Sequence, residues 1–377
     1  MTRSSKPSLS LWDQQFLRFA ISLGKRNEGR TWPNPSVGAV IVSFHNSVPE
    51  IMGTGITAWG GRPHAERSVL EKLGEKAKNC TLYVSLEPCS HIGKAPPCVD
   101  IIIESGIKRV VSALKDPDIR VSGQGYSILR EHGIEVVETV IQEETNAIHE
   151  GHVSRIVKGR PFVTAKLARS ADGFVGKRGG QIRISSPLMM HHVHMMRAKA
   201  DAILAGIGTV LNDDPELTVR LPGMENRSPV RIVMDSFLHL PLSSKLVLSA
   251  GKVPLWVLCR MDAPAQKVSA LQEKGIKVIK AECVENRSHL DPDHCLKILA
   301  EQGITSLFCE GGPHIISSFM ERDLVDRFIL TTGSSQIGAG GIPAFSQETE
   351  QQLTDRFNLI RSLMIDTDLM QVYERLL

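Results

Sequence analysis

One histidine, one glutamate and two cysteines stand where they could bind a metal and move a proton. Pro63-His64-Ala65-Glu66 has the proline-first pattern of a helix start, Glu87-Pro88-Cys89 follows an apolar run typical of a strand, and Pro96-Pro97-Cys98 opens a further helical pattern. A helix N-terminus stabilises a thiolate, so the histidine and both cysteines suit zinc. Three protein ligands leave a fourth position open for water, which is typical of a catalytic site. The predicted ligands are His64, Cys89 and Cys98.

Glu66 is the predicted general acid and base beside that metal. It follows His64 by two residues, which is about 200° round a regular helix, so both can serve one ion only if the ion lies beyond the helix end. A carboxylate there can take a proton from water and pass it to a leaving group. His-x-Glu followed by Pro-Cys and a further cysteine is the zinc-deaminase signature. A closed structural zinc site, or a histidine beside two buried thiols, is the alternative.

Composition narrows the classes of partner. The chain has 377 residues, 42% of them hydrophobic, and 44 Lys and Arg against 41 Asp and Glu, for a net charge of +3. This balance does not favour a protein that neutralises nucleic acid, so small molecules are the expected partners. The seven cysteines are spread along a chain in which we find no export signal or membrane span, which favours free thiols or metal ligands over disulfides and a cytoplasmic location.

Alternating helical and strand-like patterns predict an α/β protein of two domains. A helix face runs from Trp12 to Leu23 and is expected to stop at Pro33 and Pro35, and the run Val37 to Val42 predicts a strand buried on both faces. The pattern breaks near Lys158-Gly159-Arg160-Pro161. We therefore predict domains at 1–157 and 158–377.

Further elements follow from the same periodicities. In the first half, helices are expected near 64–77, 97–105, 122–132 and 142–157, and strands at 81–86, 108–113 and 134–138. In the second half, strands are expected at 202–205, 230–234, 254–258, 276–279, 305–309 and 327–331, and helices near 187–199, 264–274, 292–302 and 313–322.

Two glycine-containing turns in the second half could approach a phosphate-bearing cofactor. Gly311-Gly312-Pro313 stands between a predicted strand and a predicted helix, where backbone N–H groups and the helix dipole would face an anion. Gly206-Ile207-Gly208-Thr209 lacks the third glycine of the dinucleotide fingerprint, so a standard Rossmann domain is not indicated. A tight strand-to-helix turn is the alternative for this second segment. His191, His192 and His194, on a methionine-rich helix, are assigned no chemistry.

Taken in order, these motifs resemble the family of bacterial bifunctional riboflavin-biosynthesis deaminase-reductases from about residue 12 to 335. Cys98 follows Cys89 by nine residues, which is that family's spacing and not the Cys-x-x-Cys of nucleic-acid deaminases. The matching segments are Pro33–Val40, Gly61–Glu66, Leu86–His91, Pro96–Cys98, Asp116-Pro117, Lys166–Gly173, Arg197–Val210, Asp213–Arg220 and Glu310–Pro313.

The resemblance implies a cytidine-deaminase-like three-layer α/β domain followed by a dihydrofolate-reductase-like domain. It implies zinc-dependent hydrolysis of the 2-amino group of a diaminopyrimidinone ribosyl 5-phosphate, and then NADPH-dependent reduction of the ribosyl group to ribityl. One zinc ion per chain, NADPH and a homo-oligomer are expected.

The resemblance also implies roles for individual residues. The expected contacts to the substrate are Asn34, Arg197, Leu217, Arg220 and Glu310. The expected contacts to NADPH are Ala168, Thr209, Asp213, Ser236, Gly312, Pro313, His314, Ile315, Ile316, Ser317 and Ser318. Gln181 and Arg183 depart from the family pattern in a segment expected to contact cofactor and substrate.

The same residues leave two alternative functions. A nucleic-acid or nucleoside base deaminase with an accessory nucleotide-binding domain would be expected to have the short Cys-x-x-Cys and, for nucleic acid, a basic, aromatic-rich groove. In this chain the second cysteine follows the first by nine residues, and 5% of the residues are aromatic. A zinc and nucleotide sensor without turnover is the second alternative, and the presence of Glu66 argues against it for the first domain.

Overall fold

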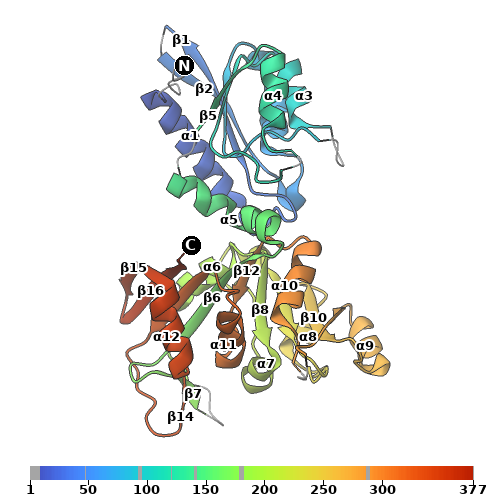
Figure 1. Cartoon of the computed structure of the whole chain (residues 1–377), viewed down its shortest axis with the longest axis vertical. Helices are drawn as coiled ribbons and strands as arrows, with labels where there is room; N and C mark the ends of the chain where they lie inside the picture. The colour runs from blue at the N-terminus through green and yellow to red at the C-terminus, as the bar shows by residue number, and fades with distance from the viewer. Residues whose placement is uncertain are drawn as a thin grey trace. The chain divides into compact units, whose positions relative to one another are not determined.

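Internal contacts divide the chain into two compact units, Met1–Gly159 and Arg160–Leu377. The computed structural model describes residues 9–46, 48–91, 96–119, 121–139, 142–177, 182–285 and 289–376. Figure 1 labels the elements of each unit along the chain. Gln181 lies outside the described residues, whereas Arg183 is described and exposed.

Unit 1 is built on a mixed five-stranded sheet with the order β2-β1-β3-β4-β5. Its strands are β1 (Gly38–His45), β2 (Val48–Ile56), β3 (Thr81–Val84), β4 (Arg109–Ser112) and β5 (Glu135–Glu138). Strand β1 is antiparallel to β2 and β3, whereas β3, β4 and β5 are parallel. The segments that follow β3 and β4 and the segment that precedes β1 therefore meet at one edge of the sheet.

Helices cover both faces of this sheet and make three layers. They are α1 (Leu11–Gly24), α2 (Ala65–Leu73), α3 (Cys98–Glu104), α4 (Gln124–Glu131) and α5 (Gln142–Lys158). Val40 and Val42 of β1 pack in one core with α1 and α5, and Ala39 and Ile41 pack in the other with α2, α3 and α4. The predicted strand buried on both faces is confirmed, because alternate side chains enter opposite cores.

The predicted stop of the first helix was wrong. Helix α1 begins with a capping box between Ser10 and Asp13 and ends at Gly24, well before Pro33. A Cβ built on Gly24 would lie 2.5 Å from the Ile148 side chain and 3.1 Å from the Gly38 nitrogen. Close packing against α5 and β1, rather than a proline, therefore coincides with the end of this helix.

Unit 2 is built on a nine-stranded sheet with the order β11-β10-β9-β8-β12-β6-β13-β16-β15, and β14 pairs separately with β7. The strands are β6 (Phe162–Arg169), β7 (Phe174–Lys177), β8 (Ala202–Gly206), β9 (Val230–Met234), β10 (Leu255–Arg260), β11 (Lys277–Ala281), β12 (Ser306–Cys309), β13 (Arg327–Thr332), β14 (Gly341–Pro343), β15 (Phe357–Ile365) and β16 (Asp368–Arg375). Neighbouring strands from β11 to β13 are parallel, and β16 and β15 close the sheet as an antiparallel hairpin.

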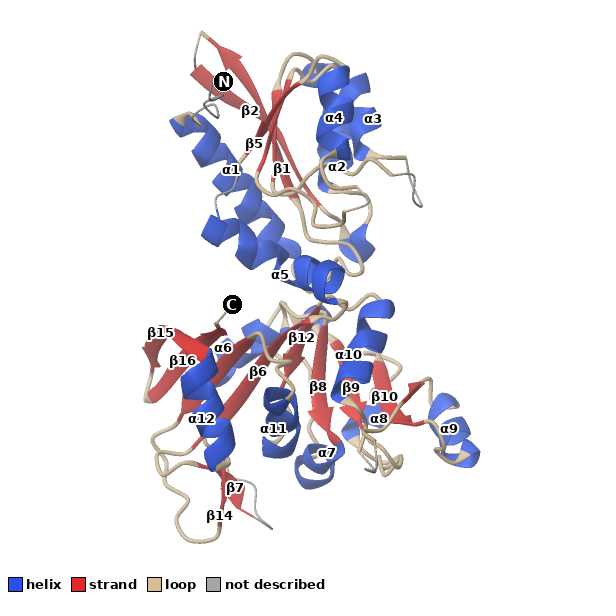
Figure 2. Cartoon of the chain, in the orientation of Figure 1, coloured by secondary structure: helices blue, strands red, loops and turns tan. Residues whose placement is uncertain are grey.

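Seven α-helices accompany this sheet in the described part of unit 2. They are α6 (Pro187–Arg197), α7 (Ile207–Asp213), α8 (Lys245–Leu248), α9 (Ala265–Gln272), α10 (Pro292–Glu301), α11 (Pro313–Glu321) and α12 (Gln347–Arg356). Short 3-10 turns occur at Lys25–Asn27, Trp59–Gly61, Gly74–Ala77 and Glu225–Arg227. Figure 2 shows α10, α11 and α12 on the near side of the sheet, whereas α6 and α8 belong to a core that includes Ile203 and Val233.

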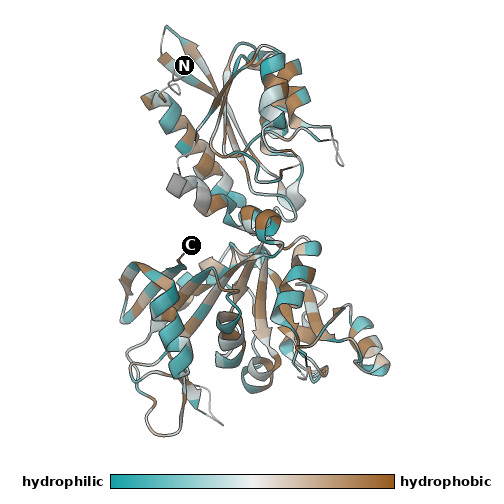
Figure 3. Cartoon of the chain, viewed as in Figure 1, coloured by the Kyte–Doolittle hydropathy of each residue, from teal (hydrophilic) through white to brown (hydrophobic). Residues whose placement is uncertain are grey.

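The apolar residues follow these layers. Figure 3 shows apolar residues concentrated along the central strands, whereas α12 is almost entirely hydrophilic. Within the described residues, no helix is long and apolar enough to cross a membrane. Several elements were not predicted from the sequence, namely β2, β7, α7, α8, β14, α12, β15 and β16.

Candidate active sites

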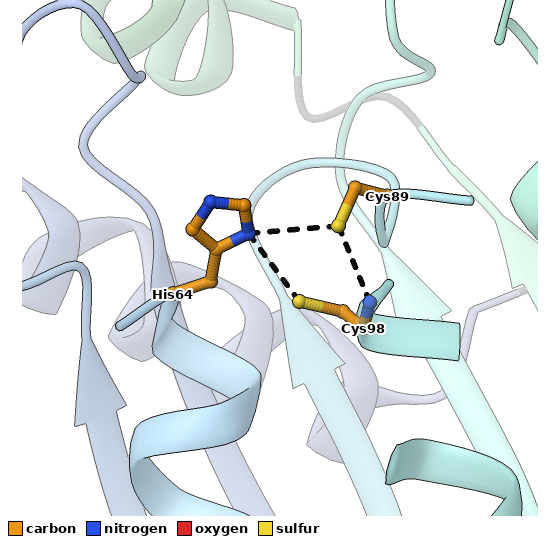
Figure 4. A group of neighbouring side chains, drawn as sticks. All are labelled: His64, Cys89 and Cys98. Carbon is orange, nitrogen blue, oxygen red and sulfur yellow. Dashed lines mark hydrogen bonds between the residues drawn. The ribbon is translucent and has the colours of Figure 1, made fainter. Parts of the chain in front are cut away.

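The three predicted zinc ligands lie together at one edge of the unit 1 sheet. His64 is the residue before α2, Cys89 lies in the segment after β3, and Cys98 is the first residue of α3. The Nδ1 atom of His64 is 3.5 Å from the Cys89 Sγ and 3.4 Å from the Cys98 Sγ. Figure 4 shows the three side chains pointing toward one another. All three ligand atoms lie within 4.8 Å of one another, and within the described residues no other histidine, cysteine or carboxylate group meets that criterion.

These distances fit a tetrahedral zinc ion. Zn–S bonds of about 2.3 Å and Zn–N bonds of about 2.05 Å at a tetrahedral angle put nitrogen and sulfur about 3.6 Å apart. The two observed separations fall just short of this value. The His64 Nε2 atom has no hydrogen-bond partner within the described structure, so Nδ1 is the nitrogen that faces the thiols.

The pKa values of the two cysteine thiols are shifted in opposite directions. The Cys98 thiol donates a hydrogen bond that lowers the pKa of Cys89 to about 4, and the same bond together with burial raises the pKa of Cys98. The Cys98 backbone N–H also donates to the Cys89 Sγ at 3.2 Å. Backbone donors at the start of α3 therefore stabilise a thiolate at the position where a cation would bind.

Glu66 lies in the first turn of α2 beside this cluster. It is 3% exposed, and burial raises the pKa of its carboxyl group, while the nearby His64 partly opposes that shift. It interacts with the Cys98 thiol as well. A carboxyl group whose pKa is moved toward neutrality is suited to accept and return a proton at physiological pH.

Two further residues connect the segments around the metal cluster. Asn34 donates to the Gly61 carbonyl at 2.9 Å and so lies against the segment that leads to His64. The Glu87 carboxylate accepts backbone N–H groups from Asp116, Gly123 and Gly125 at 3.1, 2.9 and 3.0 Å. Sequence reasoning placed Glu87 in the Pro-Cys motif but gave it no role, because its partners follow a different strand.

The predicted cofactor residues of unit 2 gather at the carboxyl ends of four adjacent parallel strands. Ser236 follows β9, Thr209 and Asp213 lie on α7 after β8, and Ala168 lies near the end of β6. The residues Gly312 to Ser318 form the start of α11 after β12. Ligands of open α/β sheets bind at this edge of the sheet.

At the start of α11 the backbone carries small residues and no capping side chain from the described part of the chain, so a ligand could come close to it. Gly312 is its N-cap and Pro313 its first residue, and no side chain of the described structure caps it. A Cβ built on Gly311 would lie 2.7 Å from the Ile315 side chain, so the strand and helix pack too closely there for a larger residue. The Ser317 hydroxyl lies 3.0 Å from the Thr349 hydroxyl and is engaged by the protein.

Arg197 and Glu310, two of the predicted substrate residues, form a buried bidentate ion pair. Arg197 Nε donates to Glu310 Oε1 at 2.8 Å, and Nη2 donates to Oε2 at 2.7 Å. Arg197 Nη1 donates to the Thr218 carbonyl at 3.0 Å. These bonds use three of the five guanidinium N–H donors and leave two for a ligand.

The other predicted substrate residues lie on the segment that Thr218 belongs to. Leu217 is buried with a φ of 53°, and Arg220 pairs with Glu216 at 2.9 Å in a half-exposed position. Two neighbours were missed by sequence reasoning. His194, to which the sequence analysis assigns no chemistry, is buried, and its Nδ1 accepts the Arg220 backbone N–H at 3.3 Å. Burial lowers the pKa of His194 to about 4.

Lys166 is the second missed residue. It lies on β6, partly buried, and desolvation lowers the pKa of its ammonium group, with the nearby Glu310 opposing the shift. A lysine between Ala165 and Leu167 in a predominantly apolar segment was the available signal, since a buried position is rarely charged without a partner.

Known proteins match both units. Residues 10–114 match the cytidine and deoxycytidylate deaminase zinc-binding region, and residues 161–370 match the RibD C-terminal domain. The riboflavin biosynthesis protein RibD of Aquifex aeolicus is 40% identical over 87% of this chain and 88% of its own length. The protein of the same name from Escherichia coli is 34% identical over 87% of this chain and 89% of its own length.

Solved structures give the same result. RibD of Acinetobacter baumannii superposes with a TM-score of 0.84 at 29% identity, over 97% of this chain and 99% of that one. The diaminohydroxyphosphoribosylaminopyrimidine deaminase/5-amino-6-(5-phosphoribosylamino)uracil reductase of Thermotoga maritima superposes with a TM-score of 0.81 at 31% identity, over 97% and 99% of the two chains. The expected fold class, a cytidine-deaminase-like domain followed by a dihydrofolate-reductase-like domain, is confirmed. The chain belongs to the RibD family of bifunctional deaminase-reductases of riboflavin biosynthesis.

Proposed function

We propose that this chain deaminates 2,5-diamino-6-ribosylamino-4(3H)-pyrimidinone 5-phosphate and then reduces the ribosyl group of the product to ribityl. The observation that carries the first reaction is the cluster of His64 Nδ1 and the two cysteine Sγ atoms with Glu66 buried beside it. We assign deamination to residues 1–157 and reduction to residues 158–377.

His64, Cys89 and Cys98 would hold the zinc ion. Zinc bound there supplies, as in other hydrolytic zinc sites, a water acidified to a pKa near 7 as the nucleophile. Glu66 accepts one proton from this water and delivers it to the pyrimidine ring nitrogen. It then accepts the second proton, from the hydroxyl group added at C2, and delivers it to the departing ammonia. Its raised pKa lets the same carboxyl group both accept and donate near neutral pH. Asn34, fixed by the Gly61 carbonyl, orients the pyrimidine.

The second reaction needs the sugar carbon, a hydride and a proton at one place. NADPH supplies the hydride, and the residues that would hold it are those at the carboxyl ends of β6, β8, β9 and β12, with the start of α11 directed at its phosphates. The hydride adds to C1′ while the bond from C1′ to the ring oxygen breaks. The leaving ring oxygen takes a proton.

Lys166 is the group that we assign to that proton. Its lowered pKa makes it a better acid than an exposed lysine, and Glu310 lies close enough to interact with its charge. Arg197 and Arg220 bind the substrate phosphate. The two hydrogen bonds from Arg197 to Glu310 fix the orientation of the Arg197 guanidinium group. Leu217, in its left-handed conformation, packs beneath the substrate.

The remaining parts of the proposal are one zinc ion per chain, NADPH rather than NADH, a homo-oligomeric assembly and a cytoplasmic location. The small-molecule substrate explains why a chain of net charge +3 needs no strongly basic surface.

The proposal is tested with purified zinc-loaded protein and the diaminopyrimidinone ribosyl phosphate. We expect ammonia release without NADPH, and NADPH oxidation only after ammonia has been released. Ammonia release that stays at the level of zinc-free protein would refute the deaminase assignment. NADPH that remains unoxidised in the presence of authentic deaminated substrate would refute the reductase assignment.

A further inference from the structure

One face of helix α5 contacts three separate segments of unit 1. His149, His152 and Arg155 are spaced three residues apart, so they lie along the same side of the helix. His149 Nε2 lies 3.0 Å from the Ser85 carbonyl, His152 Nε2 lies 3.6 Å from Asp116 Oδ1, and Arg155 Nη1 donates to the Pro33 carbonyl at 3.1 Å.

Those three segments meet at the edge of the sheet that carries the metal cluster. Ser85 follows β3 and is four residues before Cys89, and its hydroxyl accepts the Gly38 N–H at the start of β1. Pro33 precedes Asn34, which bonds to Gly61 near His64. The third segment is the Asp116 loop, residues 113–119, which follows β4.

A hydrogen bond joins the Asp116 loop to the segment that contains Cys89. The backbone N–H of Asp116 donates to the Glu87 carboxylate, two residues before Cys89. At the start of α4, a Cβ built on Gly125 would lie 2.3 Å from the Pro88 carbonyl, which shows how closely the backbone beyond the loop packs there. A shift of the loop would therefore disturb the segment that ends in a metal ligand.

His152 on α5 faces the Asp116 side chain of the same loop. Its side chain is 11% exposed, and neither ring nitrogen has a hydrogen-bond partner within the described residues at normal hydrogen-bond distance. The facing Asp116 side chain is 17% exposed and accepts the Asp118 N–H at 2.9 Å. A buried imidazole with unused nitrogens is costly unless it serves a neighbouring polar group, and Asp116 is the carboxylate within ion-pair distance.

We propose that His152 is a positioning residue of the deaminase site, which acts through the Asp116 carboxylate to hold the Asp116 loop against the metal-binding segment. The role in deamination rests on the proposed function. The contact itself is a property of the fold: helix α5 contacts the Asp116 carboxylate, and Glu87 accepts the Asp116 backbone N–H.

The test compares two substitutions of this histidine. His152→Phe keeps an aromatic ring and removes both nitrogens, whereas His152→Gln keeps an N–H donor. We expect His152→Phe to raise the KM for the pyrimidine about tenfold, as the loss of one polar contact worth about 1.4 kcal/mol would, with kcat and zinc content unchanged. His152→Gln should restore part of the KM. His45→Gln, on the exposed end of β1, is the matched control and should behave as wild type.

A double-mutant cycle identifies the partner. In an Asp116→Asn background, His152→Phe should have no further effect on KM, because the contact is already broken. Independent, additive effects would overturn the proposal, and so would an unchanged KM in the zinc-loaded His152→Phe enzyme. Loss of zinc in parallel with activity would also overturn it, since that outcome means general damage to the site.

Amide hydrogen exchange tests the contact without relying on activity. His152→Phe should speed exchange in the Asp116 loop while α3 stays protected, and His152→Gln should not. Unchanged exchange in the loop would refute the proposal even if the enzyme deaminates another substrate. A wild-type protein that fails to deaminate, with the exchange result as expected, would instead refute the proposed function alone.

Discussion

The two candidate sites are organised in opposite ways. In unit 1 three ligand atoms converge within 4.8 Å of one another on a point where a cation fits, and the His64 imidazole has no other partner among the described residues. In unit 2 the charged groups are already paired, Arg197 with Glu310 through two hydrogen bonds. The first site converges on a position where a cation would bind. In the second site the Glu310 carboxylate already balances the charge of Arg197, and only two of the guanidinium N–H donors remain for a ligand.

This difference predicts which property, activity or stability, each site loses when one of its residues is substituted. A site built around one ion is expected to lose its activity completely when a ligand is removed, with little effect on the fold. A site built on an internal ion pair is expected to lose stability and activity together, because the remaining partner is left buried and unpaired.

The largest expected effect is that of substituting a proposed zinc ligand. Cys89→Ser should abolish zinc binding and reduce deamination by more than about a thousandfold, since changes to residues that only hydrogen-bond to a metal ligand already cost about 10–100-fold. Reduction of authentic deaminated substrate should continue at the wild-type rate. Metal analysis and the two separate assays check this, and a variant that deaminates while free of zinc would contradict it.

Glu66→Gln should have the next largest effect. The amide keeps the size of the side chain but cannot accept the proton, so deamination should fall about 10²–10⁴-fold. Zinc content should stay at one ion per chain. Ammonia release at the wild-type rate would remove Glu66 from the mechanism.

Arg197→Ala should reduce both the stability of unit 2 and its reductase activity. Removal of one partner of a buried pair costs about 3–5 kcal/mol, so the free energy of unfolding of unit 2 should fall by an amount of that order while Glu310 is left unpaired. The half-exposed Arg220 pairs with Glu216, and Arg220→Ala should cost less than about 1 kcal/mol. Urea unfolding of the two variants gives the comparison, and equal losses would contradict it.

His149 should give the smallest effect, as a pH dependence of stability. Burial, with a contribution from His152, lowers the pKa of His149 to about 3. The unfolded chain therefore binds a proton that the folded chain does not between about pH 6.5 and 3, and stability falls with decreasing pH by up to about 1.4 kcal/mol per unit. His149→Gln should lose this part of the slope in urea unfolding between pH 7.5 and 5. A slope identical to that of the wild type would show that His149 protonates in the folded state.

The metal cluster could be predicted from sequence because its signals are local. His64 and Cys98 each stand at a proline-marked helix start, and Cys89 directly follows a strand. Each position is fixed by its own few neighbours, and the α/β order then brings all three to one sheet edge. The central strands were predicted for the same reason, since burial on both faces produces continuous apolar runs.

The parts that sequence did not predict depend on partners far away along the chain. Helix α12 is almost wholly hydrophilic, and strand β15 exposes seven of its nine residues, so neither has the apolar pattern of a buried element. The contact between His152 and Asp116 joins residues on different elements, and the burial of His194 depends on the segment around Arg220. The pattern of apolar and polar residues within one segment carries no information about such contacts between segments.

The central claim, that one chain holds two sites with separate chemistry, is tested most directly by a reciprocal product analysis by mass spectrometry. Glu66→Gln should leave the diaminopyrimidinone unchanged with or without NADPH, yet convert authentic deaminated substrate to a product with two more hydrogens. Arg197→Ala, assayed at a temperature where it is folded, should accumulate deaminated ribosyl product even with NADPH. If either variant loses both conversions while folded and zinc-loaded, the two sites are not separate and the account is wrong.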